Sequence, residues 1–167
     1  MNNQKTAVGY QHIWDFLGQT WKWEKRHQDV FNEIKNTISS HDTLQLFNPE
    51  QQIIITTDAS NDGIGAVLLQ KDQNEFERPV MHVSRTLKKA ENNYSTTEKE
   101  ALAIIYAVKK FNEYIYGRKF NIVTDHKPLE GIFDSKSGLS SIASSRITRW
   151  WSYLAGYNYM VTYRSGK

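Results

Sequence analysis

The sequence of 167 residues contains no cysteine, which excludes disulfide bonds and thiolate metal ligands. No apolar run approaches the ~20 residues that span a membrane. The polar start MNNQKTAVGYQ also lacks the apolar segment of a secretion signal. Hydrophobic residues make up 39% of the chain and charged residues 23%, which is typical of a globular protein. We therefore expect an intracellular protein with no membrane association.

The net charge is also small, at +3, although the isoelectric point lies near 9.0. A basic balance is compatible with a polyanionic partner such as nucleic acid, but many proteins without such a partner share it. Charge alone therefore does not select a function.

The N-terminal part of the chain, residues 1–48, is predicted to form a separate unit. Residues 1–20 show no clear period and predict a partly ordered arm. Residues 21–40 predict an amphipathic helix, and Pro49 closes this unit. The apolar residues at helical spacing in this helix are Val30, Phe31, Ile34 and Ile38.

The pattern then becomes typical of a sheet. Three apolar runs joined by short polar turns predict an antiparallel meander, and two later runs predict further strands. The five predicted strands are residues 53–57, 64–70, 78–87, 119–125 and 158–165.

Helical patterns separate the later strands. Residues 90–117 predict a long helix, which Ser95 or Thr96 caps and Gly117 ends. Shorter helices are predicted at residues 127–133 and 146–157, and the six serines in residues 135–145 predict a mobile loop. The resulting order, βββαβαβ, predicts an α/β architecture with helices packed on a mixed sheet.

Three acidic residues stand at the ends of these elements. Asp58 ends the first strand, Glu100 begins the main helix and Asp125 ends the fourth strand. Glu100 heads an apolar stripe that faces the core, where an acid is costly unless it is paired or bound to a metal. Glu98 heads a nearly equal stripe, so periodicity does not choose between the two glutamates.

If the fold brings these three carboxylates close together, we expect them to bind a cation. Ligands bind at the strand ends of open α/β sheets, and oxygen ligands favour Mg²⁺, with Mn²⁺ as the alternative, over zinc. Two such ions support hydrolysis of a phosphodiester. The residues alone leave a plainer interpretation open, in which Asp58 lies in a turn, Glu100 favours a helix N-terminus and Asp125 starts the next helix.

Longer motifs carry a resemblance to a known family. TDASNDGIGAVLLQ (57–70), VSRTLKKAENNYSTTEKEALAIIYAVKKF (83–111) and FNIVTDHKPLEGIF (120–133) resemble the ribonuclease H domain of gypsy-type LTR retrotransposon reverse transcriptases. The similarity runs from about Phe47 to Lys167. Upstream, WKWEKRHQDVFNEIKNTISSHDTLQLFNP looks like the connecting segment that follows the polymerase part of these polyproteins.

The resemblance implies a ribonuclease H-like fold over residues 49–167, with a five-stranded mixed sheet of three antiparallel strands and then parallel additions, flanked by helices. It implies that Asp58, Glu100 and Asp125 are catalytic and bind two divalent ions, and it favours Glu100 over Glu98. The implied activity is endonucleolytic hydrolysis of the RNA strand of RNA–DNA hybrids during reverse transcription. The implied partners are the hybrid and the polymerase and connecting domains of the same polyprotein, with no small-molecule cofactor.

The sequence departs from the family pattern near its end. The stretch YRSGK has Ser165 where the family has proline, and a fourth acid and the final helix that carries it are absent before Lys167. We therefore expect a fragment of a polyprotein or a truncated derivative, with weaker binding of one metal and reduced cutting.

Candidate substrate contacts surround the three acids, in turns and at the start of the main helix. Amides and hydroxyls there suit ribose and phosphate groups, although turn formation and helix capping explain the same residues equally well. The candidates are Ser60, Asn61, Gly63, Ser84, Arg85, Tyr94, Thr97 and His126.

The alternative hypothesis is a catalytically weak remnant that acts as a nucleic-acid-binding or structural module. An integrase or resolvase of the same fold is disfavoured by TEKEALAI followed by TDHKPL. The resemblance also predicts a cytoplasmic location in a retroelement particle, with access to the nucleus.

Overall fold

The computed structural model describes residues 22–38, 44–134 and 144–165. The chain divides into two compact units, residues 1–43 and 44–167. No helix in the described ranges is both long enough and apolar enough to cross a membrane.

Two segments predicted from the sequence lie wholly or largely outside these described residues. The predicted arm, residues 1–20, and all but the last two residues of the predicted serine-rich loop 135–145 lie outside the described residues. The last two belong to a helix, because Ser144 caps it and Ser145 is its first residue.

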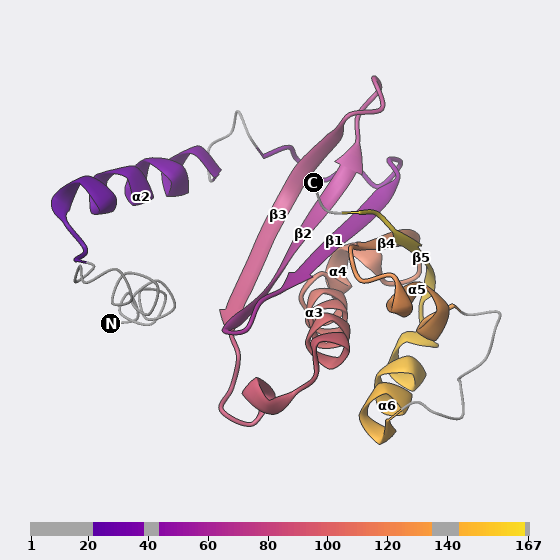
Figure 1. Cartoon of the computed structure of the whole chain (residues 1–167). Coiled ribbons are helices and arrows are strands. Elements are labelled where there is room, and N and C mark those ends of the chain that lie inside the picture. The colour runs from indigo at the N-terminus through magenta and orange to yellow at the C-terminus, as the bar shows by residue number, and fades with distance from the viewer. Residues whose placement is uncertain (1–21, 39–43, 135–143, 166–167) are drawn as a thin grey trace. The chain divides into compact units, whose positions relative to one another are not determined.

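Within the first unit the structure describes residues 22–38, of which Lys25–Ile38 form helix α2 (Figure 1). It lies within the predicted helix, 21–40, and none of its residues is buried. Its apolar stripe is instead largely exposed, with fractions of 53% at Val30 and 51% at Ile34.

The second unit contains a five-stranded sheet, as predicted (Figure 1). The strands lie in the order β3-β2-β1-β4-β5. β2 pairs antiparallel with both β1 and β3, whereas β4 pairs parallel with both β1 and β5. The strands are β1 (Ile53–Ala59), β2 (Gly63–Lys71), β3 (Glu77–Thr86), β4 (Lys119–Thr124) and β5 (Asn158–Tyr163).

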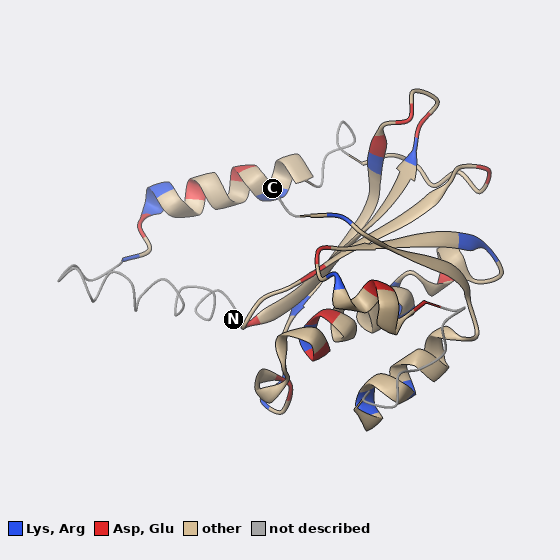
Figure 2. Ribbon diagram, turned by 45° about the vertical axis from the view of Figure 1, so that its right-hand side comes forward, with Lys and Arg blue, Asp and Glu red and all other residues tan. Residues whose placement is uncertain are grey.

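The position of each strand follows from its sequence. Ile53, Ile54 and Ile55 are all buried, as expected for a central strand that is covered on both faces. Figure 2 shows that Lys, Arg, Asp and Glu lie at the ends of the strands and leave their middles uncharged. The Lys, Arg, Asp and Glu side chains of the sheet therefore gather at the ends of its strands.

The sheet unit begins earlier than the predicted boundary after residue 48. The backbone N–H of Gln45 donates to the carbonyl of Pro79 at 2.8 Å, which attaches residue 45 to β3. The buried side chain of Gln70 accepts from the N–H of Asn48 at 2.9 Å and donates to its carbonyl at 2.7 Å. Residues 44–48 therefore belong structurally with the sheet, while the connecting-segment origin of the first unit stays a prediction.

The prediction of one continuous helix over residues 90–117 is wrong. Tyr94 adopts an extended backbone that separates a short 3₁₀ turn from the main helix, and Phe111 ends that helix. Gly117 does terminate the helical region, with a φ of +72°. The helical elements are η1 (Glu91–Asn93), α3 (Thr96–Lys110), α4 (Asn112–Ile115), α5 (Pro128–Ile132) and α6 (Ser145–Leu154).

The start of α3 has a clear local cause. The hydroxyl of Ser95 accepts the N–H of Glu98, and the carboxylate of Glu98 accepts the N–H of Ser95. This capping box satisfies two backbone donors, and such a cap stabilises a helix by about 1 kcal/mol. Of the two predicted caps, Ser95 is therefore the one used.

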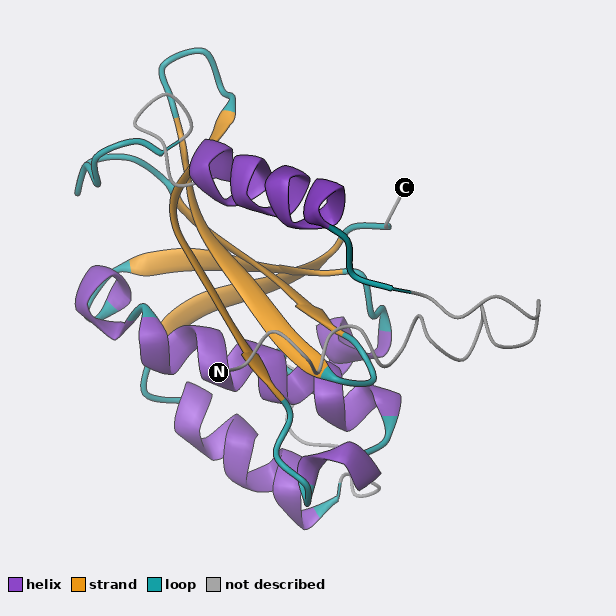
Figure 3. Ribbon diagram, turned by 90° about the vertical axis from the view of Figure 1, so that its left-hand side faces the viewer, coloured by secondary structure: helices purple, strands orange, loops and turns teal. Residues whose placement is uncertain are grey.

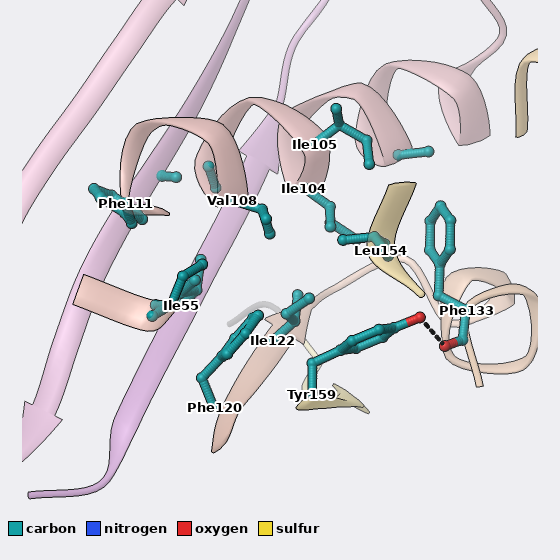
Figure 4. Close-up of a cluster of buried hydrophobic side chains, with 14 of the residues drawn as sticks. Ile55, Ile104, Ile105, Val108, Phe111, Phe120, Ile122, Phe133, Leu154 and Tyr159 are labelled. Carbon is teal, nitrogen blue, oxygen red and sulfur yellow. Dashed lines mark hydrogen bonds between the residues drawn. The ribbon is translucent and has the colours of Figure 1, made fainter. Parts of the chain in front are cut away.

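Helices α3 and α6 cover one face of the sheet (Figure 3). Figure 4 shows the core that these helices share with the sheet, where Val108 of α3 and Phe111, which directly follows α3, meet Ile55 and Ile122 of the sheet. The hydroxyl of Tyr159 donates to the carbonyl of Phe133 at 3.0 Å and so satisfies the polar end of a buried side chain. This core holds α3 against β1 and β2, and β4 lies beside β1 as its parallel neighbour.

Candidate metal centre

The three predicted acids meet at one edge of the sheet. β1 and β4 are parallel neighbours, with Thr56 paired to Val123, so their carboxyl ends lie side by side. Asp58 lies two residues beyond this pair on β1, and Asp125 follows β4 directly. One carboxylate oxygen each from Asp58, Glu100 and Asp125 lies within 4.8 Å of the other two.

The three carboxylates differ in environment. Asp58 and Asp125 are exposed, whereas Glu100 is only 5% exposed, and its Oε2 has no hydrogen-bond partner. Burial, followed by the charges of Asp125 and Asp58, raises the pKa of Glu100 to about 7, although a backbone hydrogen bond from Ala59 opposes the rise. An unpartnered buried oxygen beside two further carboxylates is unfavourable unless a proton or a cation offsets the charge.

These donors fit a hard divalent cation. All three offer carboxylate oxygens, which Mg²⁺ and Mn²⁺ accept readily, and no sulfur or imidazole ligand belongs to the group. Two exposed acids and one buried acid also leave one side of the group open to solvent.

Glu98 lies outside this group although it is only two residues from Glu100. Its carboxylate closes the capping box with Ser95 and pairs with Arg146 and Ser144 of the α6 region. Burial opposes its ionisation, but hydrogen bonds from Ser95 and the charge of Arg146 outweigh that effect and lower the pKa of Glu98. The choice that helical periodicity left open is therefore made by tertiary contacts.

The predicted hairpin contacts lie next to Asp58, in the turn between β1 and β2. The hydroxyl of Ser60 accepts the N–H groups of Asp62 and Gly63, at 3.2 and 3.0 Å. A Cβ on Gly63 would lie 3.2 Å from the carbonyl oxygen of Arg85, so β3 leaves little room for a side chain there. Ser60 and Gly63 thus have structural roles in a tight turn beside the acid group.

Two further candidates, Thr97 and His126, are brought together. Thr97 Oγ1 and His126 Nε2 share a hydrogen bond of 2.8 Å. Since Thr97 precedes Glu100 by one helical turn and His126 follows Asp125, the pair lies beside the acid group.

The remaining candidates have partners of their own. Arg85 forms a two-pronged ion pair with Glu91, at 2.6 and 3.0 Å, and its guanidinium lies over Tyr106. The carbonyl of Ser84 accepts from the hydroxyl of Tyr106, and the ring of Tyr94 packs against Arg146 at 3.9 Å. Contact with a substrate stays a prediction for these residues.

Sequence reasoning predicted neither the contact of Lys99 with Asn61 nor the pairing of Arg146 with Glu98. Lys99 is only 9% exposed, and its ammonium donates to Asn61 at 3.5 Å, while Arg146 joins α6 to Glu98. For Arg146 no local pattern exists, because its partner lies 48 residues away. For Glu98, the three-residue spacing from Ser95 is the capping-box signal that assigns it to the helix end.

Residues 48–157 match the family model described as the RNase H-like domain found in reverse transcriptase. The chain belongs to this RNase H-like family. The resemblance to gypsy-type elements that the motifs predicted is confirmed by relatives of the chain.

Curated relatives of this RNase H-like domain are retrotransposon polyproteins. The chain is 36% identical over 148 residues to the retrovirus-related Pol polyprotein from transposon gypsy of Drosophila melanogaster, covering 87% of this chain and 13% of that protein. It is 38% identical over 147 residues to the polyprotein from transposon 412 of the same organism, covering 88% and 11%. The chain therefore spans about an eighth or less of the length of these relatives.

Solved structures support the RNase H-like fold at low sequence identity. A foamy viral protease-reverse transcriptase in complex with double-stranded DNA aligns with a TM-score of 0.69 and 17% identity, covering 87% of this chain and 27% of that one. LC11-RNase H1 in complex with an RNA/DNA hybrid aligns with a TM-score of 0.52 and 15% identity, covering 68% and 86%. At these identities the similarity concerns the fold alone.

Proposed function

We propose that this chain is the ribonuclease H of a retroelement reverse transcriptase and cuts the RNA strand of RNA–DNA hybrids endonucleolytically during reverse transcription. The observation that carries the proposal is the meeting of Asp58, Glu100 and Asp125 within 4.8 Å at one sheet edge of an RNase H-like fold. These acids come from three separate elements. Separate local roles in turns or helix caps would not require them to lie together.

The proposed cofactor is a pair of Mg²⁺ ions, with Mn²⁺ as the alternative, held by the three carboxylates. Bound in pairs, such ions activate a water molecule and stabilise the leaving oxygen of a phosphodiester. The unpartnered Oε2 and raised pKa of Glu100 support this assignment, because a nearby cation favours the ionised carboxylate.

The proposed substrate is the hybrid duplex, held through its phosphates and through the 2′-hydroxyl groups that distinguish RNA from DNA. The turn beside Asp58 and the Thr97–His126 pair flank the acid group, so we assign the nearest contacts to them. Contacts farther along the duplex are proposed for Ser84, Arg85 and Tyr94.

The proposed protein partners are the polymerase and connecting domains of the same polyprotein. Support comes from the coverage of the Drosophila polyproteins, of which this chain spans 13% and 11%. The exposed apolar stripe of α2 offers these domains a surface to cover. In this setting the domain acts in the cytoplasm within a retroelement particle and has access to the nucleus.

The test is hydrolysis of an RNA–DNA hybrid whose RNA strand is labelled, with Mg²⁺ or Mn²⁺ present. We expect internal cuts in the RNA strand of the hybrid and none in single-stranded RNA or in a DNA duplex. Asp58→Asn should reduce cutting to background, whereas Glu113→Gln, which changes an exposed acid of α4 outside the acid group, should leave it unchanged.

Two outcomes would count against the proposal. Equal cutting by the wild type and Asp58→Asn would mean that the acid group does not perform the reaction. Tight binding of the hybrid without cutting in either metal would instead favour a nucleic-acid-binding module.

A further inference from the structure

Three consecutive residues at the start of α3 each bind a different part of the fold. Thr97 shares a hydrogen bond with His126, Glu98 binds Arg146 of α6, and Lys99 donates to Asn61 in the turn after Asp58. Consecutive residues of a helix point about 100° apart, which allows one turn to reach three neighbours. The turn that precedes Glu100 thus joins the helix to both loops that follow the aspartates.

The contact between Thr97 and His126 is the shorter of the two loop contacts, at 2.8 Å against 3.5 Å for Lys99 and Asn61. His126 is also held through its backbone, because its N–H donates to the hydroxyl of Thr124 at 3.1 Å. Thr124 is buried, with 1% exposure, and is the last residue of β4. Asp125 therefore lies between one residue fixed in the sheet and one residue fixed to α3.

This fixation acts against a repulsion. Asp125 is exposed and lies on a loop, and its charge faces those of Glu100 and Asp58. Without a tether the loop would relieve the repulsion by moving its carboxylate toward solvent. A cation would then have to bring the Asp125 carboxylate back toward Glu100, and this cost would weaken its binding.

We propose that Thr97 is a positioning residue which, through His126, holds Asp125 against Glu100 and thereby sets the affinity of the acid group for divalent cations. This inference rests on the proposed metal site. It assigns Thr97 and His126 to the organisation of that site in addition to any contact with the hybrid. Groups that are hydrogen-bonded to metal ligands typically change metal affinity by about 10- to 100-fold when they are removed, and Thr97, which acts one residue further out, is expected at the lower end of that range.

The experiment measures Mn²⁺ binding to the protein alone by isothermal titration calorimetry, so it requires neither substrate nor turnover. Thr97→Val removes the hydroxyl at nearly constant volume and should weaken Mn²⁺ binding by roughly 10-fold. Thr97→Ser keeps the hydroxyl and should bind nearly as the wild type does. In hydrolysis assays, the loss in Thr97→Val should be largely recovered when the Mg²⁺ concentration is raised.

Ser144→Ala is the matched control. It also removes one hydroxyl that is bound to the first turn of α3, since Ser144 donates to Glu98 at 3.2 Å, but neither residue touches an aspartate loop. Ser144 also caps α6, so we expect a lower melting temperature with unchanged Mn²⁺ affinity.

His126→Ala removes the same hydrogen bond from its other side and tests the inference independently. It should weaken Mn²⁺ binding about as much as Thr97→Val, and the double variant should lose little more, because both changes remove one interaction. Circular dichroism of each variant confirms that the protein measured is folded.

Three results would overturn the inference. They are unchanged affinity in Thr97→Val, an equal loss in Thr97→Ser, and an equal loss in Ser144→Ala. If the wild type binds Mn²⁺ and cuts the hybrid, and Thr97→Val does both equally well, the positioning role of Thr97 is refuted but the proposed function is not. A wild type that binds no Mn²⁺ would remove the proposed metal site and this inference with it.

Discussion

Replacing Glu100 with glutamine should stabilise the metal-free protein at pH 8, although the same change removes a proposed metal ligand. The pKa of Glu100 is raised from its ordinary 4.5 to about 7, by burial first and then by the charges of Asp125 and Asp58. This difference corresponds to about 3 kcal/mol of unfavourable ionisation in the folded protein. A glutamine of nearly the same size carries no charge to be buried or repelled.

The sign of the pH dependence follows from the raised pKa. The folded state binds the Glu100 proton more tightly than the unfolded state, so the contribution of this residue to stability is complete below pH 4.5 and is lost as the pH rises through about 7. The advantage of Glu100→Gln should therefore be near its maximum at pH 8 and small at pH 4.5.

Thermal unfolding in EDTA at pH 4.5 and pH 8 measures this difference. For a domain of this size, about 3 kcal/mol corresponds to a shift in Tm of roughly 10 °C, and side-chain strain in the variant will reduce it. Adding Mg²⁺ at pH 8 should raise the Tm of the wild type more than that of Glu100→Gln, because the variant has lost one ligand.

Glu98→Gln is the matched control, two residues earlier on the same helix. Its pKa is lowered, since hydrogen bonds from Ser95 and the charge of Arg146 outweigh its burial. Stability from Glu98 is therefore present at pH 8 and lost in acid, and this variant should be destabilised at pH 8 by roughly 1–2 kcal/mol. The reasoning is refuted if Glu100→Gln is less stable than the wild type at pH 8, or if its effect is equal at the two pH values.

Two further predictions concern the fold. Tyr159→Phe removes the hydrogen bond to the carbonyl of Phe133 and should lower the free energy of unfolding by about 1 kcal/mol in urea titrations, and an unchanged midpoint would contradict the role of that bond. Gly117→Ala should cost about 1 kcal/mol through its φ of +72° alone, because a Cβ there meets no atom within 4 Å. Gly131→Ala is the control: it has equal space within α5 and no positive φ, so it should be neutral or stabilising.

Much of the fold was predictable because its signals are local. The run of Ile53 to Ile55 predicts a buried strand, and the turn residues after Asp58 predict the hairpin that follows. The break at Phe111 was not predictable, because the helical period continues through it. Phe111 is fully buried, and the chain leaves α3 there with the ring fixed in the core.

The candidate site divides in the same way. The sequence by itself determined which acids stand at the ends of strands and helices, because the spacing of apolar residues and the identity of turn-forming residues depend on only a few neighbouring positions. Helical periodicity did not choose between Glu98 and Glu100, which head similar apolar stripes, although the capping-box spacing and the family resemblance favoured Glu100. Only the tertiary structure decided that the three acids meet, because the parallel pairing of β1 and β4 brings Asp58 and Asp125 to Glu100, while Arg146, 48 residues from Glu98, holds that second glutamate apart.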